Sequence, residues 1–240
     1  MIRHNVDKKH HVKSFAELHD VLSCFRKSLD WVGWIFRGQN NIDWPLIPKA
    51  GRGKFSALDD KLYFEEWKTQ AIQYITKQPK DDWEWLAIAQ HHGLATRLLD
   101  WTFNPLAAAF FAVSENLDAD AALFAFSPTS LVLTEHTNPI NLGEKGVFVY
   151  KPKHVVPRIT RQSGIFTIHH PPTLPLDQAQ GEYEQLELII IDRNYRNELV
   201  CELAQYGINK ATLFPDLDGL SEHINWMTIN HTYQQLAVKV

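Results

Sequence analysis

The segment from Asn104 to Glu115 places the strongest constraint on how this chain can fold. Asn104 is a residue type that caps helices, and Pro105 after it suits the first helical position. The residues that follow are apolar on almost every side of the expected helix, Pro105 to Glu115, and such a helix must be buried. No apolar run in the sequence approaches the roughly 18 residues that span a membrane. The segment therefore predicts a core helix, and we expect no membrane association.

Helical patterns precede most of the strand patterns along the chain, with little regular alternation. Helical periodicity is expected over residues 14–29, 56–76, 82–92 and 194–206. Strand patterns are expected over residues 31–37, 121–126, 146–150, 164–169 and 185–191. This order favours an α+β fold, with a helix-rich N-terminal half and a largely antiparallel sheet built mainly from the C-terminal half. We expect a polar tail over residues 1–13 and a single domain over residues 14–240.

Composition narrows the class of protein. Of the 240 residues, 45% are hydrophobic, which is enough for a sizeable core, and the net charge of −4 leaves no polybasic surface. General affinity for nucleic acid is therefore not implied. The two cysteines, Cys24 and Cys201, lie far apart and are typical of reduced thiols in a cytosolic protein. The first residues show no apolar core of a secretory signal, so we expect a cytoplasmic protein.

Phe36-Arg37-Gly38 ends an expected strand with a permanent charge. The arginine side chain is a planar fork whose natural partners are phosphate and carboxylate groups. The glycine lets a ligand or a second backbone come close. A structural pair between Arg37 and an aspartate explains the motif equally well.

A second polar region follows the third expected helix. Two adjacent histidines, His91 and His92, face about 100° apart on a helix and do not easily chelate one metal, so no metal is expected. Arg97 and Asp100 lie between buried leucines. They form either an internal ion pair or part of a site in which Arg97 shares an anionic ligand with Arg37 while Asp100 orients one of the two arginines.

Two later segments could also contribute to a site. Within Gln162–Phe166, Ser163 could hydrogen-bond a sugar or an amide, and Phe166 could stack on a flat ring. Glu182 and Glu184 are two residues apart at the start of a strand and so face the same side. Such a pair could activate a nucleophile and stabilise a developing cation, or it could simply be a solvated strand entry.

Together these motifs resemble the FRG domain family, which is named for its Phe/Tyr-Arg-Gly motif. The resemblance runs from about Trp31 to about Leu220. The matching motifs are Phe36-Arg37-Gly38, Gln90-His91-His92-Gly93, Thr96-Arg97-Leu98-Leu99-Asp100-Trp101-Thr102 with Asn104-Pro105, Gln162-Ser163-Gly164-Ile165-Phe166, and Leu213-Phe214-Pro215-Asp216-Leu217-Asp218-Gly219. Members of this family occur in bacteria and phages, and the resemblance implies a role related to defence or toxins.

The order Arg37, Ser163, Glu184 is also similar to that in ADP-ribosyltransferases of the Arg-Ser-Glu type. This similarity implies that NAD is bound, that Arg37 holds its phosphates or ribose, that Ser163 lies beside the nicotinamide ribose, and that Glu184 is the catalytic carboxylate. The chain departs from that pattern in a long gap between Arg37 and Ser163 and in Gln162-Ser163-Gly164, which stands where those enzymes have Ser-Thr-Ser. The residues expected to bind the cofactor are Arg37, Gly38, His92, Arg97, Asp100, Gln162, Ser163 and Phe166.

Three functions remain open from the sequence. The first is transfer of ADP-ribose from NAD to a protein or nucleic-acid acceptor, and the second is a non-catalytic sensing or interaction module. The third is a metal-dependent nuclease or phosphoesterase, whose candidate residues are His91, His92, Asp100, Asp216 and Asp218. If the motifs form one site, Arg37, His92, Arg97 and Asp100 should converge around a pocket of about 300–1,000 Å³.

Overall fold

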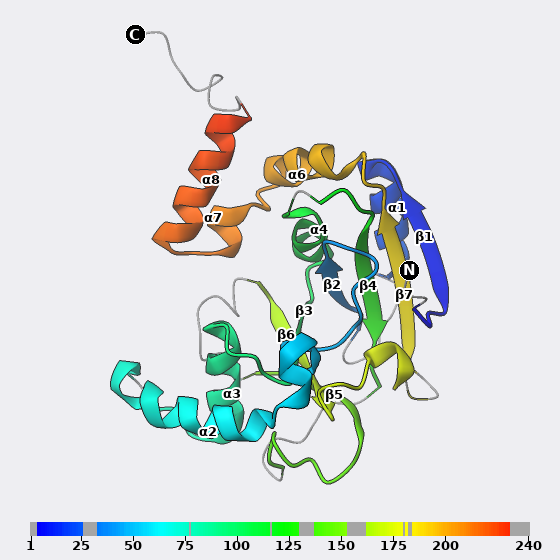
Figure 1. Cartoon of the computed structure of the whole chain (residues 1–240). Coiled ribbons are helices and arrows are strands. Elements are labelled where there is room, and N and C mark those ends of the chain that lie inside the picture. Colours follow the sequence, from blue (N-terminus) through cyan, green and yellow to red (C-terminus); the bar gives the residue numbers. More distant parts are fainter. Residues whose placement is uncertain are drawn as a thin grey trace, which may run out of the picture.

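A computed structural model describes residues 4–25, 33–76, 78–115, 117–129, 137–152, 162–179, 181 and 184–230. In these residues one seven-stranded sheet forms the centre of the protein, in the order β1-β7-β4-β2-β3-β6-β5 (Figure 1). The strands are β1 (Lys8–Val12), β2 (Ile35–Gln39), β3 (Leu98–Thr102), β4 (Ala121–Ser127), β5 (Gly146–Tyr150), β6 (Gly164–His170) and β7 (Gln185–Ile191). Neighbouring strands are antiparallel, except that β1 runs parallel to β7. The predicted α+β class is confirmed.

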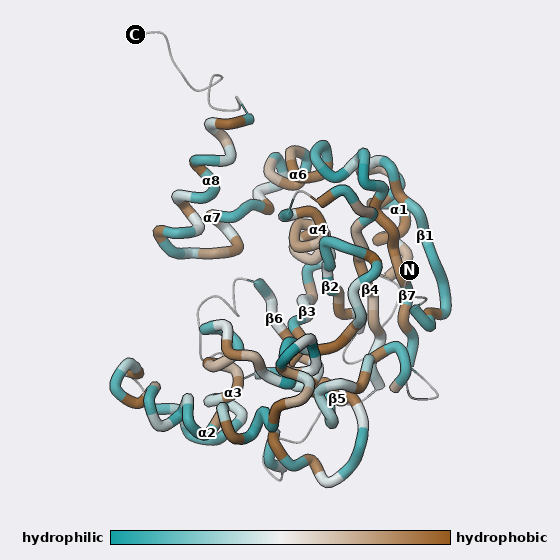
Figure 2. Tube along the Cα trace, viewed as in Figure 1, coloured by the Kyte–Doolittle hydropathy of each residue, from teal (hydrophilic) through white to brown (hydrophobic). Residues whose placement is uncertain are grey.

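The helix α4 (Pro105–Val113) lies at the core, as its sequence predicts. The Asn104 side chain accepts hydrogen bonds from the backbone N–H groups of Leu106 and Ala107, so it caps the helix. Most of the helix is buried, and its tube in Figure 2 is largely hydrophobic in colour. It packs against β2 so closely that a Cβ on Gly38 would lie 2.0 Å from the carbonyl oxygen of Ala108. The glycine of the Phe-Arg-Gly motif therefore admits a second backbone.

The remaining helices cover different parts of the sheet. Helices α1 (Phe15–Cys24) and α6 (Arg196–Gln205) share the buried apolar cluster of α4. Helices α2 (Asp60–Ala71) and α3 (Asp82–His91) pack over the β3, β6 and β5 end (Figure 1). Helices α7 (Lys210–Leu213) and α8 (Leu217–Ile229) extend away from the sheet. Short 3-10 turns are η2 (Lys49–Gly51), η3 (Gly53–Ala57), η4 (Ile72–Tyr74) and η5 (Leu176–Gln178).

Several boundaries differ from the sequence prediction for identifiable reasons. The helix expected over residues 56–76 is shorter, and α2 spans Asp60–Ala71. It begins at Asp60 because the Asp59 side chain accepts a hydrogen bond from the backbone N–H of Lys61 and so caps the helix there. The expected tail over residues 1–13 contains β1, which is tied to the sheet by hydrogen bonds between Asp7 and Leu186. The His4 ring is also buried and bonds Asp177. Among the described residues, no helix has the length and apolar character needed to cross a membrane.

Candidate functional site

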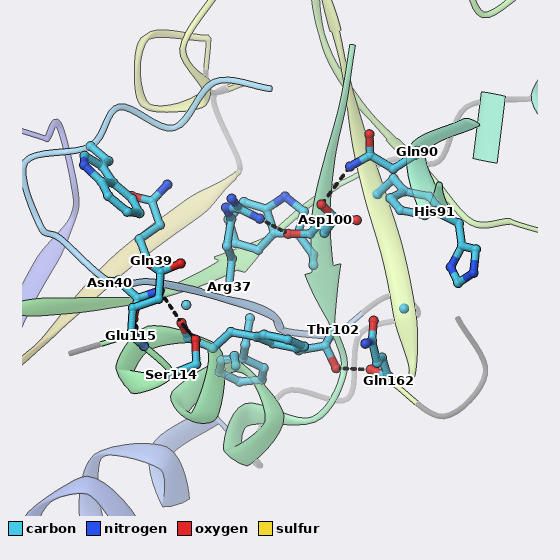
Figure 3. Close-up of a pocket in the computed structure, with 18 of the residues that line it drawn as sticks. Arg37, Gln39, Asn40, Gln90, His91, Asp100, Thr102, Ser114, Glu115 and Gln162 are labelled. Atoms are coloured by element: carbon cyan, nitrogen blue, oxygen red, sulfur yellow. Dashed lines mark hydrogen bonds between the residues drawn. The ribbon is translucent and has the colours of Figure 1, made fainter. Parts of the chain in front are cut away.

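The sheet opens between β2 and β3, and this opening creates the site. The two strands pair in register only at Phe36 and Thr102. A continued antiparallel ladder would place Gly38 opposite Asp100. Instead Nη1 of Arg37 donates a hydrogen bond of 2.8 Å to the backbone carbonyl oxygen of Asp100. The arginine side chain thus takes the place of the missing ladder bond, and a pocket of about 510 Å³ opens beside it (Figure 3).

Segments distant in the sequence supply the wall of this pocket. They are β2 and the loop after it, the turn between η2 and η3, the end of α3, β3, the inner side of α4, and the start of β6. The lining residues are Phe36, Arg37, Gly38, Gln39, Asn40, Trp44, Arg52, Gln90, His91, Gly93, Asp100, Trp101, Thr102, Ala108, Phe111, Ser114, Glu115, Gln162, Gly164 and Phe166. The wall therefore combines charged groups, amides and hydroxyls with aromatic rings.

Two arginines make part of the wall cationic. Burial lowers the pKa of Arg37 to about 10, and the charge of Asp100 acts in the opposite direction. Burial also lowers the pKa of Arg52, whose Nε and Nη2 donate to the carbonyl oxygen of Ile47. Both guanidinium groups stay charged at neutral pH, and each is close enough to the Asp100 carboxylate to feel its charge. Around Asp100 the two cations outnumber the one carboxylate, which favours an anionic group at that place, while the second carboxylate of the wall, Glu115, lies just after α4.

Four buried polar atoms have no hydrogen-bond partner among the described residues, and two of them belong to residues that line the pocket: Nε of Arg37 and Oε1 of Gln39. The other two are the Tyr63 hydroxyl and Nε of Arg196. Arg37 and Gln39 are two positions apart on β2, so their side chains lie on the same face of the strand. A buried polar atom without a partner costs about 1–3 kcal/mol. Such costs are typical of sites organised for function rather than for stability.

The Asp100 carboxylate is held in place by a chain of hydrogen bonds from the end of α3. The backbone N–H of Leu98 donates to Oγ1 of Thr96, whose hydroxyl donates to Oε1 of Gln90 at 2.5 Å. Nε2 of Gln90 then donates to Oδ2 of Asp100 at 2.8 Å. An ionised carboxylate only accepts hydrogen bonds, so the amide N–H group of Gln90 must face Asp100 and the amide oxygen of Gln90 must face Thr96. The hydrogen bond from Gln90 orients the Asp100 carboxylate (Figure 3).

The far end of the pocket is fixed by a buried arginine. Arg196 donates to the backbone oxygens of Asn40, Ala119 and Glu115 and to Oδ1 of Asn40. The same Oδ1 accepts from the backbone N–H of Glu115, and Nδ2 of Asn40 donates to the carbonyl oxygen of Phe111. This network joins the end of β2 to the end of α4 and holds Glu115 at the rim.

The sequence model of the FRG domain family matches residues 33–121. This stretch of the chain is similar to FRG domains and covers less than half of its 240 residues. No curated protein and no solved structure gives a match. The matched stretch contains β2, α2, α3, β3 and α4, which supply most of the pocket wall.

Five of the residues expected to bind or act on NAD line the pocket: Arg37, Gly38, Asp100, Gln162 and Phe166. His91, a candidate of the metal-dependent alternative, lines it as well. The carbonyl oxygen of Gln162 accepts a hydrogen bond from the Thr102 hydroxyl. The backbone of Gly38 contributes to the wall, although the side of the strand where its Cβ would lie is filled by α4.

Four of the expected residues do not line this pocket, and the first three are His92, Ser163 and Glu184. His92 is exposed and lines a different hollow, which Tyr63 and Leu94 share. Ser163 is exposed, in a turn with a φ of 49°. Glu184 lies just before β7, and its Oε2 accepts from the backbone N–H of Gly181. Glu182, the other half of the expected carboxylate pair, lies outside the described residues.

Arg97 is also outside the pocket, because it is paired elsewhere. Nε and Nη2 of its guanidinium donate to the two carboxylate oxygens of Asp60 at 2.7 and 2.6 Å, and both residues are buried. Nη1 bonds the carbonyl oxygen of Ile140 and the ring of His170. The proposed pairing of Arg97 with Asp100 is therefore wrong, and so is the shared use of one ligand by Arg97 and Arg37. Of the four residues expected to converge around one pocket, only Arg37 and Asp100 line it, and His92 and Arg97 do not.

The motif at residues 213–219 supports the pocket from outside. The Asp216 side chain accepts from the backbone N–H of Gly219 and caps α8, which explains this aspartate without a metal. Nε2 of Gln162 donates to the carbonyl oxygen of Leu213, and the Phe214 ring packs edge-on against Phe111. Among the described residues, no group of three or more metal-ligating side chains gathers.

Sequence reasoning missed Arg52, Asn40 and Arg196. Arg52 follows a loop with two prolines, and nothing in its neighbours marks it as a site residue. Asn40 and Arg196 are 156 residues apart in the chain and meet only because α6 returns over β2 and α4. Their roles depend on tertiary contacts that no local pattern encodes.

Proposed function

We propose that the protein binds an anionic nucleotide in this pocket, with NAD as the first candidate, and acts as an ADP-ribosyltransferase-like domain. The observation that carries the proposal is the pair of partly buried arginines, Arg37 and Arg52, in the wall of a pocket of about 510 Å³. Pyrophosphate is a suitable partner because the guanidinium N–H groups that are not bonded to the carbonyl oxygens of Asp100 and Ile47 can donate to its oxygens. The volume is in the range of small-molecule sites.

The rest of the wall suits the other parts of a nucleotide. Oε1 of Gln39, which has no partner among the described residues, offers an amide acceptor, and Trp44 and Phe111 offer flat apolar surfaces. Aromatic rings stack on nucleobases, and amides bind sugars and carboxamides. NAD combines all of these groups with a pyrophosphate.

The proposed reaction breaks the bond between nicotinamide and C1′ of the ribose. Nicotinamide leaves with the bonding electrons, a nucleophile of the protein or nucleic-acid acceptor attacks C1′, and the acceptor loses a proton. A carboxylate near C1′ would stabilise the cationic transition state. The resemblance assigns this role to Glu184, whereas the carboxylates that line the pocket are Asp100 and Glu115. Glu184→Gln tests the assignment: unchanged turnover would transfer the role to a pocket carboxylate.

A non-catalytic sensing module is the second candidate, and the position of Glu184 outside the pocket favours it. Such a module would bind the same nucleotide and pass the signal to a partner without cleaving it. The two candidates differ in one measurement, the release of nicotinamide from bound NAD.

The test is the stability of the protein with and without NAD. Ligand at about 100 times its dissociation constant adds about 2.7 kcal/mol to the free energy of unfolding. For a chain of this length that is a rise in Tm of roughly 5–11 °C. We expect the shift to vanish in Arg37→Ala and Arg52→Gln and to persist in Arg193→Gln, which changes an exposed arginine outside the pocket.

Two variants are needed because Arg37 also bridges β2 to β3, so Arg37→Ala could lose binding by disturbing the strands. Arg37→Lys keeps the charge and removes the planar fork, and it should weaken NAD binding without abolishing the fold. No shift of the wild-type Tm with millimolar NAD would refute NAD as the ligand. A shift with no nicotinamide released would favour the sensing module.

A further inference from the structure

Among the residues that the structure describes, the Asp100 carboxylate makes no direct ion pair with the pocket arginines, although its charge favours the charged form of both. A carboxylate that only balanced Arg37 would be expected to form a two-pronged pair with its guanidinium. Instead Arg37 donates to the backbone oxygen of Asp100, and the carboxylate is turned to Nε2 of Gln90. Among the described residues, no ion pair joins the Asp100 carboxylate to Arg37 or Arg52.

One oxygen of this carboxylate is left available to a ligand. Oδ2 is occupied by Gln90, and no hydrogen bond to Oδ1 is formed within the described part of the chain. Asp100 is exposed, and it is exposed into the pocket. An ionised carboxylate is an acceptor only, so its partner on a ligand must be a hydrogen-bond donor.

A carboxylate would be a disadvantage in a site for phosphate alone, because it repels the anion that the arginines attract. Its presence in the same pocket as the arginines points to a ligand that carries both an anionic group and hydroxyl donors. We propose that the pocket takes a 5′-phosphorylated ribose unit, in which Arg37 and Arg52 hold the phosphate and Asp100 accepts hydrogen bonds from the vicinal 2′ and 3′ hydroxyls. Acidic side chains bind ribose hydroxyls in this way in dinucleotide-binding folds. This inference rests on the anion site of the proposed function and names the part of the nucleotide that is recognised.

The experiment measures the binding of three probes by calorimetry: AMP, 2′,3′-dideoxy-AMP and inorganic pyrophosphate. Each is titrated into the wild-type protein, Asp100→Asn and the control Asp118→Asn, which removes an exposed carboxylate outside the pocket. A hydrogen bond to a charged group predicts that the wild type binds the dideoxy compound at least about tenfold more weakly than AMP. In Asp100→Asn this difference should shrink to about twofold or less, and in Asp118→Asn it should persist.

The direction in which Asp100→Asn changes the affinity for pyrophosphate and for AMP distinguishes a ribose-binding Asp100 from one that acts only as a counter-ion. Removing the negative charge of Asp100 should tighten the binding of pyrophosphate, which has no hydroxyl groups to lose, while it weakens the binding of AMP. If AMP and pyrophosphate both bind Asp100→Asn more tightly by the same factor, Asp100 is only a counter-ion and the proposal is overturned. Equal binding of AMP and the dideoxy compound by the wild type also overturns it, and this comparison does not depend on the folding of any variant.

Failure of this inference can be told apart from failure of the proposed function. If NAD stabilises the wild type through Arg37 and Arg52 but removal of the diol has no effect, the ribose assignment alone fails. If AMP shows the expected pattern but NAD neither binds nor is cleaved, the ADP-ribosyltransferase assignment alone fails. If none of the three probes binds, the anion site itself is refuted, and both proposals fail with it.

Discussion

Gly38 offers a direct test of why the Phe-Arg-Gly motif ends in glycine. In the structure its backbone lies against α4, where a Cβ would meet the carbonyl oxygen of Ala108 at 2.0 Å and the backbone nitrogen of Ala112 at 2.4 Å. Both contacts are with backbone atoms, so no side chain can rotate away to relieve them. In Gly38→Ala the helix must therefore move away from β2 by about 1 Å or more to restore an ordinary contact.

Overpacking of this kind costs typically 1–3 kcal/mol, and the rigid backbone contacts place Gly38→Ala at or above the upper end, about 3 kcal/mol. For a chain of this length, that is a fall in Tm of roughly 6–12 °C. The assay is urea unfolding followed by tryptophan fluorescence, with Gly181→Ala as the matched control. There the nearest atoms to a new Cβ lie at 3.6 Å, an ordinary contact, so we expect little change. If Gly38→Ala is as stable as the wild type and loses only ligand binding, the glycine is there for the ligand and our explanation of the motif is wrong.

Two further predictions concern buried polar groups. Asp60→Asn should cost about 3–5 kcal/mol of stability, because it leaves the Arg97 charge buried without its partner; equilibrium urea unfolding measures the loss, and a cost near zero would contradict the pairing. Burial lowers the pKa of His169 to about 4, below the ordinary 6.5, so the folded protein binds this proton more weakly than the unfolded chain. Its contribution to stability is therefore complete above pH 6.5 and is lost as the pH falls towards 4, by up to about 1.4 kcal/mol per pH unit. Unfolding free energies measured from pH 7 to pH 4 should fall less steeply in His169→Gln, and an unchanged slope would show that His169 is not the group responsible.

Local patterns in the sequence were sufficient for most of the secondary structure. The strands β5 and β7 have the predicted bounds, and β4 and β6 differ by one residue. The cap at Asn104 and the helix after it were recognisable because capping and burial leave clear local signals. In contrast, two strands were not expected. Lys8 to His11 are polar, and β1 is defined by its pairing with β7, while Leu98 to Thr102, which forms β3, was interpreted only as the entry to the buried helix.

The site was predictable only in part. The motifs indicated Arg37, Asp100 and Gln162, which line one pocket, because polar residues in apolar surroundings are unusual wherever they occur. The partner of each charge was not predictable. Arg97 lies three residues from Asp100 but pairs with Asp60, which is 37 positions away and reaches it because α2 packs against α3. Proximity in sequence was a poor guide here because β3 sends alternate side chains to opposite faces.

We propose that Arg37 and Arg52 form an anion site in the pocket between β2 and β3. A crystal structure of the protein soaked with ADP-ribose would locate the phosphate groups relative to the two arginines. We predict phosphate oxygens within hydrogen-bonding distance of both guanidinium groups, about 2.7–3.2 Å, and ribose hydroxyls next to Asp100. A ligand bound anywhere else, or density in the pocket with its phosphates turned away from both arginines, would contradict the account.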